Sequence, residues 1–186
     1  MIKTVYVIAG PTATGKSELA ISLGNKINGA VINSDSMQVY KNLEILTARP
    51  SINEMKNIDH HLYGYVDGNE RYNVERWCND AVEIIKKTSA NNLTPILVGG
   101  TGLYIHTLIN GLIDLPPIPE AIKKESEKIL EEFGKDFLIN QINNTDPQSL
   151  KEINHNDIVR LRRIWEVFEK KKKKFSEWKL NENKKI

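Results

Sequence analysis

The sequence predicts an α/β fold, a parallel sheet flanked by helices, joined to an all-helical segment. Short apolar runs alternate with helix-patterned runs as far as Ile109, and this alternation is typical of βαβ units with parallel strands. The character changes at Leu115–Pro119, where three prolines within five residues remove backbone donors and stiffen the chain. Beyond these prolines the patterns are helical, so we expect a boundary there.

The strands and helices of the α/β part follow in order. Buried strands are predicted where short apolar runs are bounded by Gly, Asn, Asp or Pro, and helices where apolar residues recur at helical spacing. The predicted strands are Thr4–Ala9, Ala30–Asn33, a weaker one at His61–Tyr65, and Pro95–Val98. The predicted helices between them are Lys16–Ile27, Val74–Thr88 and Gly102–Ile109.

The all-helical segment contains its own start signal. Asp146-Pro147 favours a helix start, because aspartate caps the first turn and proline fits its first position. The predicted helices are Glu120–Phe133, Lys135–Asn143, Asp146–Glu152 and Asp157–Lys173. We therefore expect a core over residues 1–114, a helical insertion over 115–173, and a basic tail over 174–186 that leaves the core incomplete.

Composition narrows the class of protein. Hydrophobic residues make up 40% and charged residues 27% of the chain, a balance that supports a buried globular core. No apolar run approaches the ~20 residues that cross a bilayer, and the N-terminus leads into a strand instead of a signal peptide. We therefore expect a cytoplasmic monomer without a membrane partner. The lone Cys78 excludes an intrachain disulfide and a cysteine-rich metal site.

Charge is unevenly spread along the chain, although the net charge is only +2. From Leu150 to Ile186 there are 12 Lys and Arg against 6 Asp and Glu, which gives +6 and leaves −4 for the other residues. This asymmetry indicates either a polyanionic partner for the C-terminal region or a solvated helix face.

One motif carries specific chemistry. The string Gly10-Pro11-Thr12-Ala13-Thr14-Gly15-Lys16-Ser17 matches the P-loop pattern G-x-x-x-x-G-K-[ST] between a predicted strand and a predicted helix. Its backbone N–H groups and the helix dipole favour phosphate, Lys16 adds a charge, and the Ser17 hydroxyl suits Mg²⁺. We therefore expect a P-loop NTPase-like core that binds a diphosphate or triphosphate. Nucleotide hydrolases, kinases and transferases all use this loop.

Asp35 follows the second predicted strand, at the sheet edge where ligands bind in parallel α/β folds. Its carboxylate could hold Mg²⁺ through water, accept a proton from a nucleophile, or cap the next helix. The neighbouring pair His60 and His61 is a poor metal site, because adjacent side chains point to opposite faces of a strand.

Six stretches together resemble the tRNA dimethylallyltransferases in order and spacing. They are the P-loop, N-S-D-S-M-Q-V-Y at 33–40, T-A-R-P at 47–50, D-H-H-L at 59–62, G-G-T-G-L-Y at 99–104 and N-D-I-V-R-L-R-R at 156–163. Members of that family are longer, so this chain is expected to lack the C-terminal third. Arg49 stands where the family has lysine, which keeps the charge but changes the geometry.

The resemblance implies transfer of a dimethylallyl group from dimethylallyl diphosphate to N6 of the adenine next to the tRNA anticodon. The P-loop and Mg²⁺ on Ser17 would then stabilise the diphosphate leaving group, with Lys16 and Thr12 among the catalytic contacts. Asp35, which as an aspartate is ordinarily ionised at neutral pH, would act as general base. The adenine must be flipped out of the RNA loop to react.

The resemblance also implies tRNA contacts in two regions. The first contains Asp35, Ser36, Met37, Gln38 and Thr101. There, Gln38 could pair with both a donor and an acceptor of adenine, and Thr101 is equally suited to cap a helix. The second contains Val159, Arg160, Leu161, Arg162 and Arg163, for which a solvated helix face is the alternative. Arg49 is a candidate phosphate ligand, or else half of an exposed salt bridge.

Three other functions are compatible with a P-loop beside a carboxylate. An adenylate isopentenyltransferase would act on free nucleotide, although the basic helical segment argues for RNA. A small-molecule kinase would prefer ATP to an allylic diphosphate. An inactive nucleotide- or tRNA-binding fragment would bind its ligands without turnover.

Overall fold

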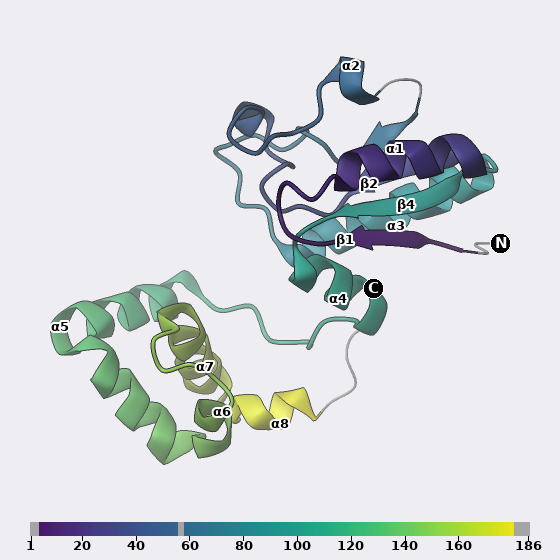
Figure 1. Cartoon of the computed structure of the whole chain (residues 1–186). Coiled ribbons are helices and arrows are strands. Elements are labelled where there is room, and N and C mark those ends of the chain that lie inside the picture. The colour runs from purple at the N-terminus through teal and green to yellow at the C-terminus, as the bar shows by residue number, and fades with distance from the viewer. Residues whose placement is uncertain (1–3, 56–57, 181–186) are drawn as a thin grey trace. The chain divides into compact units, whose positions relative to one another are not determined.

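A parallel four-stranded sheet organises the first part of the chain in the computed structural model, which describes residues 4–55 and 58–180 (Figure 1). Its strands are β1 (Tyr6–Ala9), β2 (Gly29–Asn33), β3 (His60–His61) and β4 (Thr94–Gly99). Their order is β1-β4-β2-β3, and each neighbouring pair is parallel. The predicted α/β class is confirmed, although the weak strand expected at 61–65 is reduced to two residues.

The carboxyl ends of three strands meet at one edge of this sheet. Ala9 of β1 pairs with Gly99 of β4, and Asn33 of β2 pairs with Val98 of the same strand. The chain leaves this edge into the P-loop after β1 and into Asp35 after β2. The segments that carry the predicted site residues therefore begin side by side, as expected for parallel strands.

Three helices cover the sheet, namely α1 (Lys16–Ile27), α3 (Val74–Ala90) and α4 (Gly102–Asn110). Two short helical elements, η1 (Lys41–Leu43) and α2 (Ile52–Met55), lie in the segment between β2 and β3. Ile32 and Leu97 pack in a cluster with residues of α3 and α4, whereas Val31 and Ile96 pack with residues of α1. Because both faces of β2 and β4 are covered, these strands are continuous apolar runs. The three long helices are confirmed, whereas η1 and α2 were not predicted.

The expectation of a buried strand at Thr4–Ala9 is wrong for its side chains. Tyr6 and Val7 of β1 are 41% and 42% exposed. Among the described strands, β1 lies at the end of the order and pairs with β4. Apolar composition indicated the strand, whereas the burial of its side chains depends on what packs against the faces of the sheet.

A second compact unit follows Gly111, close to the expected proline boundary. Its helices are α5 (Glu120–Thr145), α6 (Pro147–Lys151), α7 (Ile158–Lys171) and α8 (Phe175–Lys179). α5 is broken at Gly134, where φ is 75° and ψ is 177°, so helices lie on either side of that residue as predicted. In the core of this unit, Leu138 and Ile142 pack with Leu161 and Ile164.

The buried carboxylate of Asp146 joins α6 to α8. It accepts hydrogen bonds from the N–H and hydroxyl of Ser149 at 3.2 and 2.6 Å. It also accepts them from the N–H and hydroxyl of Ser176 at 2.9 and 2.7 Å. The predicted helix start at Asp146 is confirmed. Part of the expected basic tail is therefore a packed helix, while 181–186 lie outside the described residues.

The described helices of both units are too short or too polar to cross a membrane.

Candidate active site

The P-loop lies between β1 and α1, where the motif predicted it. Ala13 and Gly15 have positive φ angles of 63° and 75°, and Gly15 is the N-cap of α1. Among the described residues, no atom lies within 4 Å of the place a Cβ on Gly15 would take, so its positive φ is the reason that glycine is favoured there. The Thr14 hydroxyl and the Lys16 ammonium donate to the Pro11 carbonyl at 2.9 and 2.5 Å, which closes the loop on itself.

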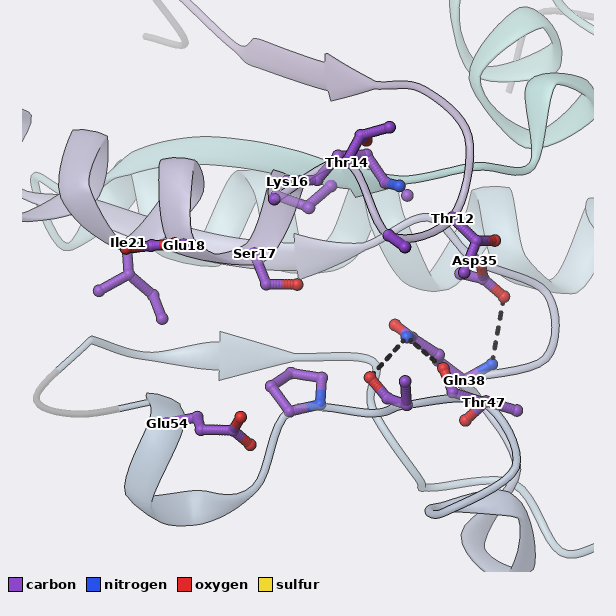
Figure 2. Close-up of a pocket in the computed structure, with 16 residues that line it drawn as sticks. Thr12, Thr14, Lys16, Ser17, Glu18, Ile21, Asp35, Gln38, Thr47 and Glu54 are labelled. Carbon is purple, nitrogen blue, oxygen red and sulfur yellow. Dashed lines mark hydrogen bonds between the residues drawn. The ribbon is translucent and has the colours of Figure 1, made fainter.

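A pocket of about 480 Å³ opens beside this loop (Figure 2). It is lined by Thr12, Ala13, Thr14, Gly15, Lys16, Ser17, Glu18, Ile21, Asp35, Gln38, Thr47, Ala48, Pro50, Glu54, Val98 and Gly99. These residues come from the P-loop and α1, from the segment after β2, from α2 and the segment leading into it, and from the end of β4. The predicted phosphate loop and the predicted base therefore share one cavity, of a size typical for small ligands.

Asp35 uses one carboxylate oxygen to hold its own turn. Its Oδ1 accepts the backbone N–H groups of Met37 and Gln38 at 2.9 and 3.4 Å. Within the described parts of the chain, no donor reaches Oδ2, and this oxygen faces Gly100. The capping interpretation thus applies to a turn instead of a helix, and it leaves the second oxygen available for chemistry.

Asn33 positions Asp35 and was missed by the sequence analysis. It is fully buried, its Oδ1 accepts the Asp35 N–H at 2.9 Å, and its Nδ2 donates to the Asp35 and Leu62 carbonyls at 3.0 Å each. The Trp77 indole N–H donates to the Asn33 carbonyl at 2.9 Å. A buried amide with all these partners is costly to change. The signal was present as an asparagine ending an apolar strand.

Thr101 is tied to Ser36 across the sheet edge. Its hydroxyl accepts the Ser36 N–H at 2.9 Å and donates to the Ser36 hydroxyl at 3.2 Å. Thr101 is the N-cap residue of α4, but its side chain makes no capping bond. Nearby, a Cβ on Gly99 would lie 2.3 Å from the Ser34 carbonyl carbon, so a glycine is required for this close approach. Ser36 and Thr101, two of the residues expected to contact the RNA, are thus brought together.

The other residues of the 36–38 string differ in how they face the pocket. Met37 is 49% exposed and does not line the cavity. Gln38 does line it, but its Nε2 is already bonded to the Thr47 carbonyl at 2.9 Å. The amide nitrogen of Gln38 thus already donates to the protein, and the expected pairing of Gln38 with adenine stays a prediction.

Arg49 does not line the pocket, and its guanidinium is bonded to other groups of the protein. Its guanidinium donates to the Tyr40 carbonyl at 3.2 Å and to Glu44 Oε2 at 2.9 Å. A Cβ on Gly64 would lie 1.8 Å from its Nη1, so the guanidinium occupies space that a side chain at 64 would need. Its candidate role as a phosphate ligand is replaced by a structural one, since its donors bind the protein itself.

Two tyrosines near Asp35 stay neutral. Burial, followed by the negative charge of Asp35, raises the pKa of Tyr63 beyond its usual range. Burial, together with Tyr40 and Asp35, raises the pKa of Tyr104 to about 12. Both phenols therefore stay protonated at neutral pH and do not act as bases there.

The histidine pair is similarly neutral. Burial lowers the pKa of both His60 and His61. In residues 4–55 and 58–180, no group of three or more His, Cys, Asp or Glu side chains is arranged to hold a metal ion. A cation in the pocket would therefore need ligand oxygens from the phosphate as well as from the protein.

The predicted RNA-contacting residues of α7 fall into two sets. Val159 is 79% exposed, and the Arg160 side chain is 69% exposed beside Asp157 at 3.2 Å. Arg163 is half-buried, and burial lowers its pKa. Leu161 is fully buried in the core, so its expected RNA contact is wrong.

Arg162 also points inward. Its guanidinium donates to the Ser126 hydroxyl at 3.0 Å and to Glu127 Oε1 at 2.9 Å. Ser126 in turn donates to Glu166 Oε1 at 2.7 Å, and both of these residues are buried. Arg162 therefore links α7 to α5 inside the second unit.

Comparison with protein families gives two matches. Residues 38–186 match the family described as IPP transferase, and residues 3–67 match the one described as isopentenyl transferase. Proteins named tRNA dimethylallyltransferase from Hyphomonas neptunium and Rhizobium etli are 44% and 43% identical to this chain. The alignments cover 87% and 89% of this chain but 51% and 56% of those proteins. The chain thus spans about half the length of the curated relatives it matches.

Solved structures give the same relationship. A eukaryotic dimethylallyltransferase acting on tRNA is 36% identical with a TM-score of 0.75, over 97% of this chain and 44% of that one. A tRNA isopentenylpyrophosphate transferase from Bacillus halodurans is 32% identical with a TM-score of 0.57, over 89% of this chain and 55% of that one. Sequence and fold agree, and the chain belongs to the IPP transferase family.

Proposed function

We propose that this chain carries the reaction pocket of a tRNA dimethylallyltransferase, which moves a dimethylallyl group from its diphosphate to N6 of the adenine next to the anticodon. The observation that carries the proposal is the free Oδ2 of Asp35 in the same pocket as the P-loop. A kinase can also use a carboxylate base, so the choice of prenyl transfer is supported by the names of the relatives.

The reaction assigns a task to each part of the pocket. The allylic C–O bond breaks and its electron pair leaves with the diphosphate, while adenine N6 forms the new C–N bond. N6 gives up one proton, which Asp35 Oδ2 accepts. Lys16, the N–H groups of the loop and the N-terminus of α1 stabilise the charge on the departing diphosphate, and the Thr12 hydroxyl lines the same space.

Mg²⁺ fits this pocket through Ser17. The Ser17 side chain lines the cavity and has no hydrogen-bond partner in the part of the chain that the structure describes. Mg²⁺ commonly takes one or two protein oxygens and completes its shell with phosphate oxygens and water. When bound, the ion would neutralise charge on the diphosphate. Ser17 and the P-loop would hold this ion–diphosphate pair.

A tRNA substrate is supported by the exposed side chains of α7. Val159 and Arg160 face solvent, and a cation at that surface attracts a phosphate backbone. We infer that these two residues, more than Arg162 or Leu161, contact the anticodon stem-loop. A tRNA substrate also agrees with the cytoplasmic location expected from the sequence. That the protein is a monomer stays a prediction.

The proposal is tested by transfer of radiolabelled dimethylallyl from its diphosphate to unmodified tRNA in the presence of Mg²⁺. Asp35→Asn keeps the size of the side chain but removes the base, so the initial rate should fall by at least about 100-fold. Asp67→Asn is a matched control, because Asp67 Oδ1 accepts the Asn69 N–H at 3.0 Å in a similar turn outside the pocket.

The outcomes separate the competing functions. An equal rate in the wild type and Asp35→Asn would remove Asp35 from the role of base. Transfer to free AMP in preference to tRNA would instead identify an adenylate isopentenyltransferase. Folded protein that labels neither acceptor would contradict a transferase activity for this chain.

A further inference from the structure

The indole of Trp77, a fully buried residue of α3, is bonded to the last residue of β2. Its Nε1–H donates to the Asn33 carbonyl at 2.9 Å, between residues 44 positions apart in the chain. The neighbouring strand β3 pairs with β2 at Val31 and Ile32, one residue short of Asn33. The indole therefore supplies a donor at the level where the pairing with β3 has ended.

Asn33 connects this bond to Asp35. The Asn33 side chain accepts the Asp35 N–H at 2.9 Å and donates to the Asp35 carbonyl at 3.0 Å. Both backbone polar groups of Asp35 are thus bonded to one side-chain amide. Because that amide is attached to the backbone that Trp77 holds, a shift of the Asn33 carbonyl would also shift Asp35.

The same indole also packs against the helix that holds the other side of the Asp35 turn. Its ring is stacked on Tyr104 of α4, with ring centroids 4.5 Å apart and an interplanar angle of 16°. The Tyr104 N–H donates to the Thr101 carbonyl at 3.0 Å, in the first turn of that helix. The Thr101 hydroxyl accepts the Ser36 N–H at 2.9 Å. Trp77 is therefore linked to the residues on both sides of Asp35.

Trp77 does not reach the ligand itself. It is fully buried and does not line the pocket, whereas Asp35 does (Figure 2). Packing of the core would require only an apolar ring at this position, and the bond from the indole N–H to a strand carbonyl is additional. A buried carbonyl that loses its donor is costly, and a movement of the backbone toward another donor would relieve that cost. Such a movement would carry Asp35 with it.

We propose that Trp77 is a positioning residue for the general base, because its contacts hold the turn that aims Asp35 Oδ2 at the amine. This inference rests on the proposed function. Proton transfer requires the base within hydrogen-bond distance of the amine as the C–N bond forms, so a displaced carboxylate slows the chemical step. The groups that hold the diphosphate belong to the P-loop, and their affinity for diphosphate does not depend on Trp77.

The test removes the indole N–H without changing the shape of the ring. In Trp77→3-benzothienylalanine, a sulfur atom replaces the N–H, so the stack on Tyr104 is kept and the bond to Asn33 is lost. The single-turnover rate of dimethylallyl transfer from its diphosphate to unmodified tRNA, at saturating concentrations and in Mg²⁺, should fall by about tenfold. The Kd for inorganic diphosphate with Mg²⁺, measured by isothermal titration calorimetry, should stay as in the wild type.

Ile85→Ala is the matched control, because Ile85 belongs to the same core cluster of the first unit as Trp77. It opens a void and should lower the urea midpoint of unfolding at least as much as the indole isostere does. Its transfer rate should nevertheless remain close to that of the wild type, because the bond between Trp77 and Asn33 is still present. Equal slowing in the two variants would show that Trp77 acts through stability alone and would overturn the positioning role.

A second measurement follows the Asp35 turn without turnover. The backbone N–H groups of Met37 and Gln38 donate to Asp35 Oδ1, so their resonances in ¹H–¹⁵N NMR spectra report where that carboxylate lies. In the Trp77 isostere these two resonances should move, whereas in Ile85→Ala they should stay near their wild-type positions. Unmoved resonances in the isostere would contradict the positioning role whatever the rate.

The outcomes distinguish this inference from the function on which it rests. Transfer by the wild type, with an equal rate in the Trp77 isostere, would overturn the role of Trp77 while leaving the transferase intact. Folded wild type that labels neither tRNA nor AMP would overturn the proposed function and this inference with it.

Discussion

Asp35 and Gln38 in the pocket, and the arginines of α7, were both predicted to contact ligands, but the structure uses them differently. In the pocket, each side chain has one atom bonded to the backbone and another left facing the cavity. In α7, Arg162 is bonded inside its own unit, whereas Arg160 faces solvent. Loop residues at a sheet edge are oriented by nearby backbone groups, whereas residues on a helix are divided between core and surface by how that helix packs.

The largest effect should come from the backbone contact that shapes the pocket. A Cβ at Gly99 would lie 2.3 Å from the Ser34 carbonyl carbon, which is backbone and cannot turn aside. Gly99→Ala should lower the free energy of unfolding by about 3 kcal/mol, measured by urea denaturation. Gly102→Ala should leave it nearly unchanged, because no atom of residues 4–55 and 58–180 lies within 4 Å of that Cβ position. Equal losses in the two variants would show that the close approach is unimportant.

Phosphate binding should depend next on Lys16. Lys16→Met removes the cation of the loop and should weaken binding of inorganic diphosphate with Mg²⁺ by about 100-fold, measured by isothermal titration calorimetry. The matched control is Lys26→Met, an exposed lysine in the last turn of the same helix, which should bind as wild type does. If the two variants bound diphosphate equally well, the pocket would not be a phosphate site.

The two arginines of α7 sharpen the comparison directly. Arg162→Met leaves the buried Glu166 without its cationic neighbour at 3.5 Å and should cost about 2 kcal/mol of unfolding free energy. Arg160→Met should cost less than about 1 kcal/mol, because its ion pair with Asp157 is exposed. RNA affinity should follow the opposite order once stability is accounted for, with Arg160→Met the weaker binder. Measurements of unfolding and RNA binding on both variants would reveal any reversal.

The smallest effect is a pH dependence in the helical unit. Burial opposes ionisation of Asp146, but the hydrogen bonds from Ser149 and Ser176 outweigh it and lower the pKa of the folded state. The resulting stability is present above about pH 4, where an unfolded aspartate is ionised, and is lost as pH falls through the folded-state pKa. Thermal unfolding followed by circular dichroism should show this loss.

Two variants check the source of that pH dependence. Asp146→Asn should be less stable at neutral pH and should lose part of the decline in acid. Asp136→Asn, an exposed aspartate of α5, should retain the wild-type profile. An unchanged profile in Asp146→Asn would assign the acid sensitivity to other carboxylates.

Local signals predicted much of the fold. The P-loop, the range of α1, the cap at Asp146 and the break at Gly134 each depend on residues close together in the chain. The helical period of α7 also indicates that Leu161 is buried, because it lies three residues before the buried Ile164 on the same helix face. The short elements η1, α2 and α8 were missed, because a few residues carry too weak a pattern and depend on distant partners such as Asp146.

By itself, the sequence determined the place of the P-loop between a strand and a helix, the long helices, the parallel class of the sheet and the family. Each of these depends on a residue pattern repeated along a short stretch, for which backbone geometry leaves few alternatives. The tertiary structure decided which oxygen of Asp35 is free, which end of the Gln38 amide faces the pocket, and which arginine of α7 reaches solvent. Those outcomes depend on partners brought together by folding, and a hydrogen bond to Thr47 or Ser126 leaves no trace in the local pattern of Gln38 or Arg162.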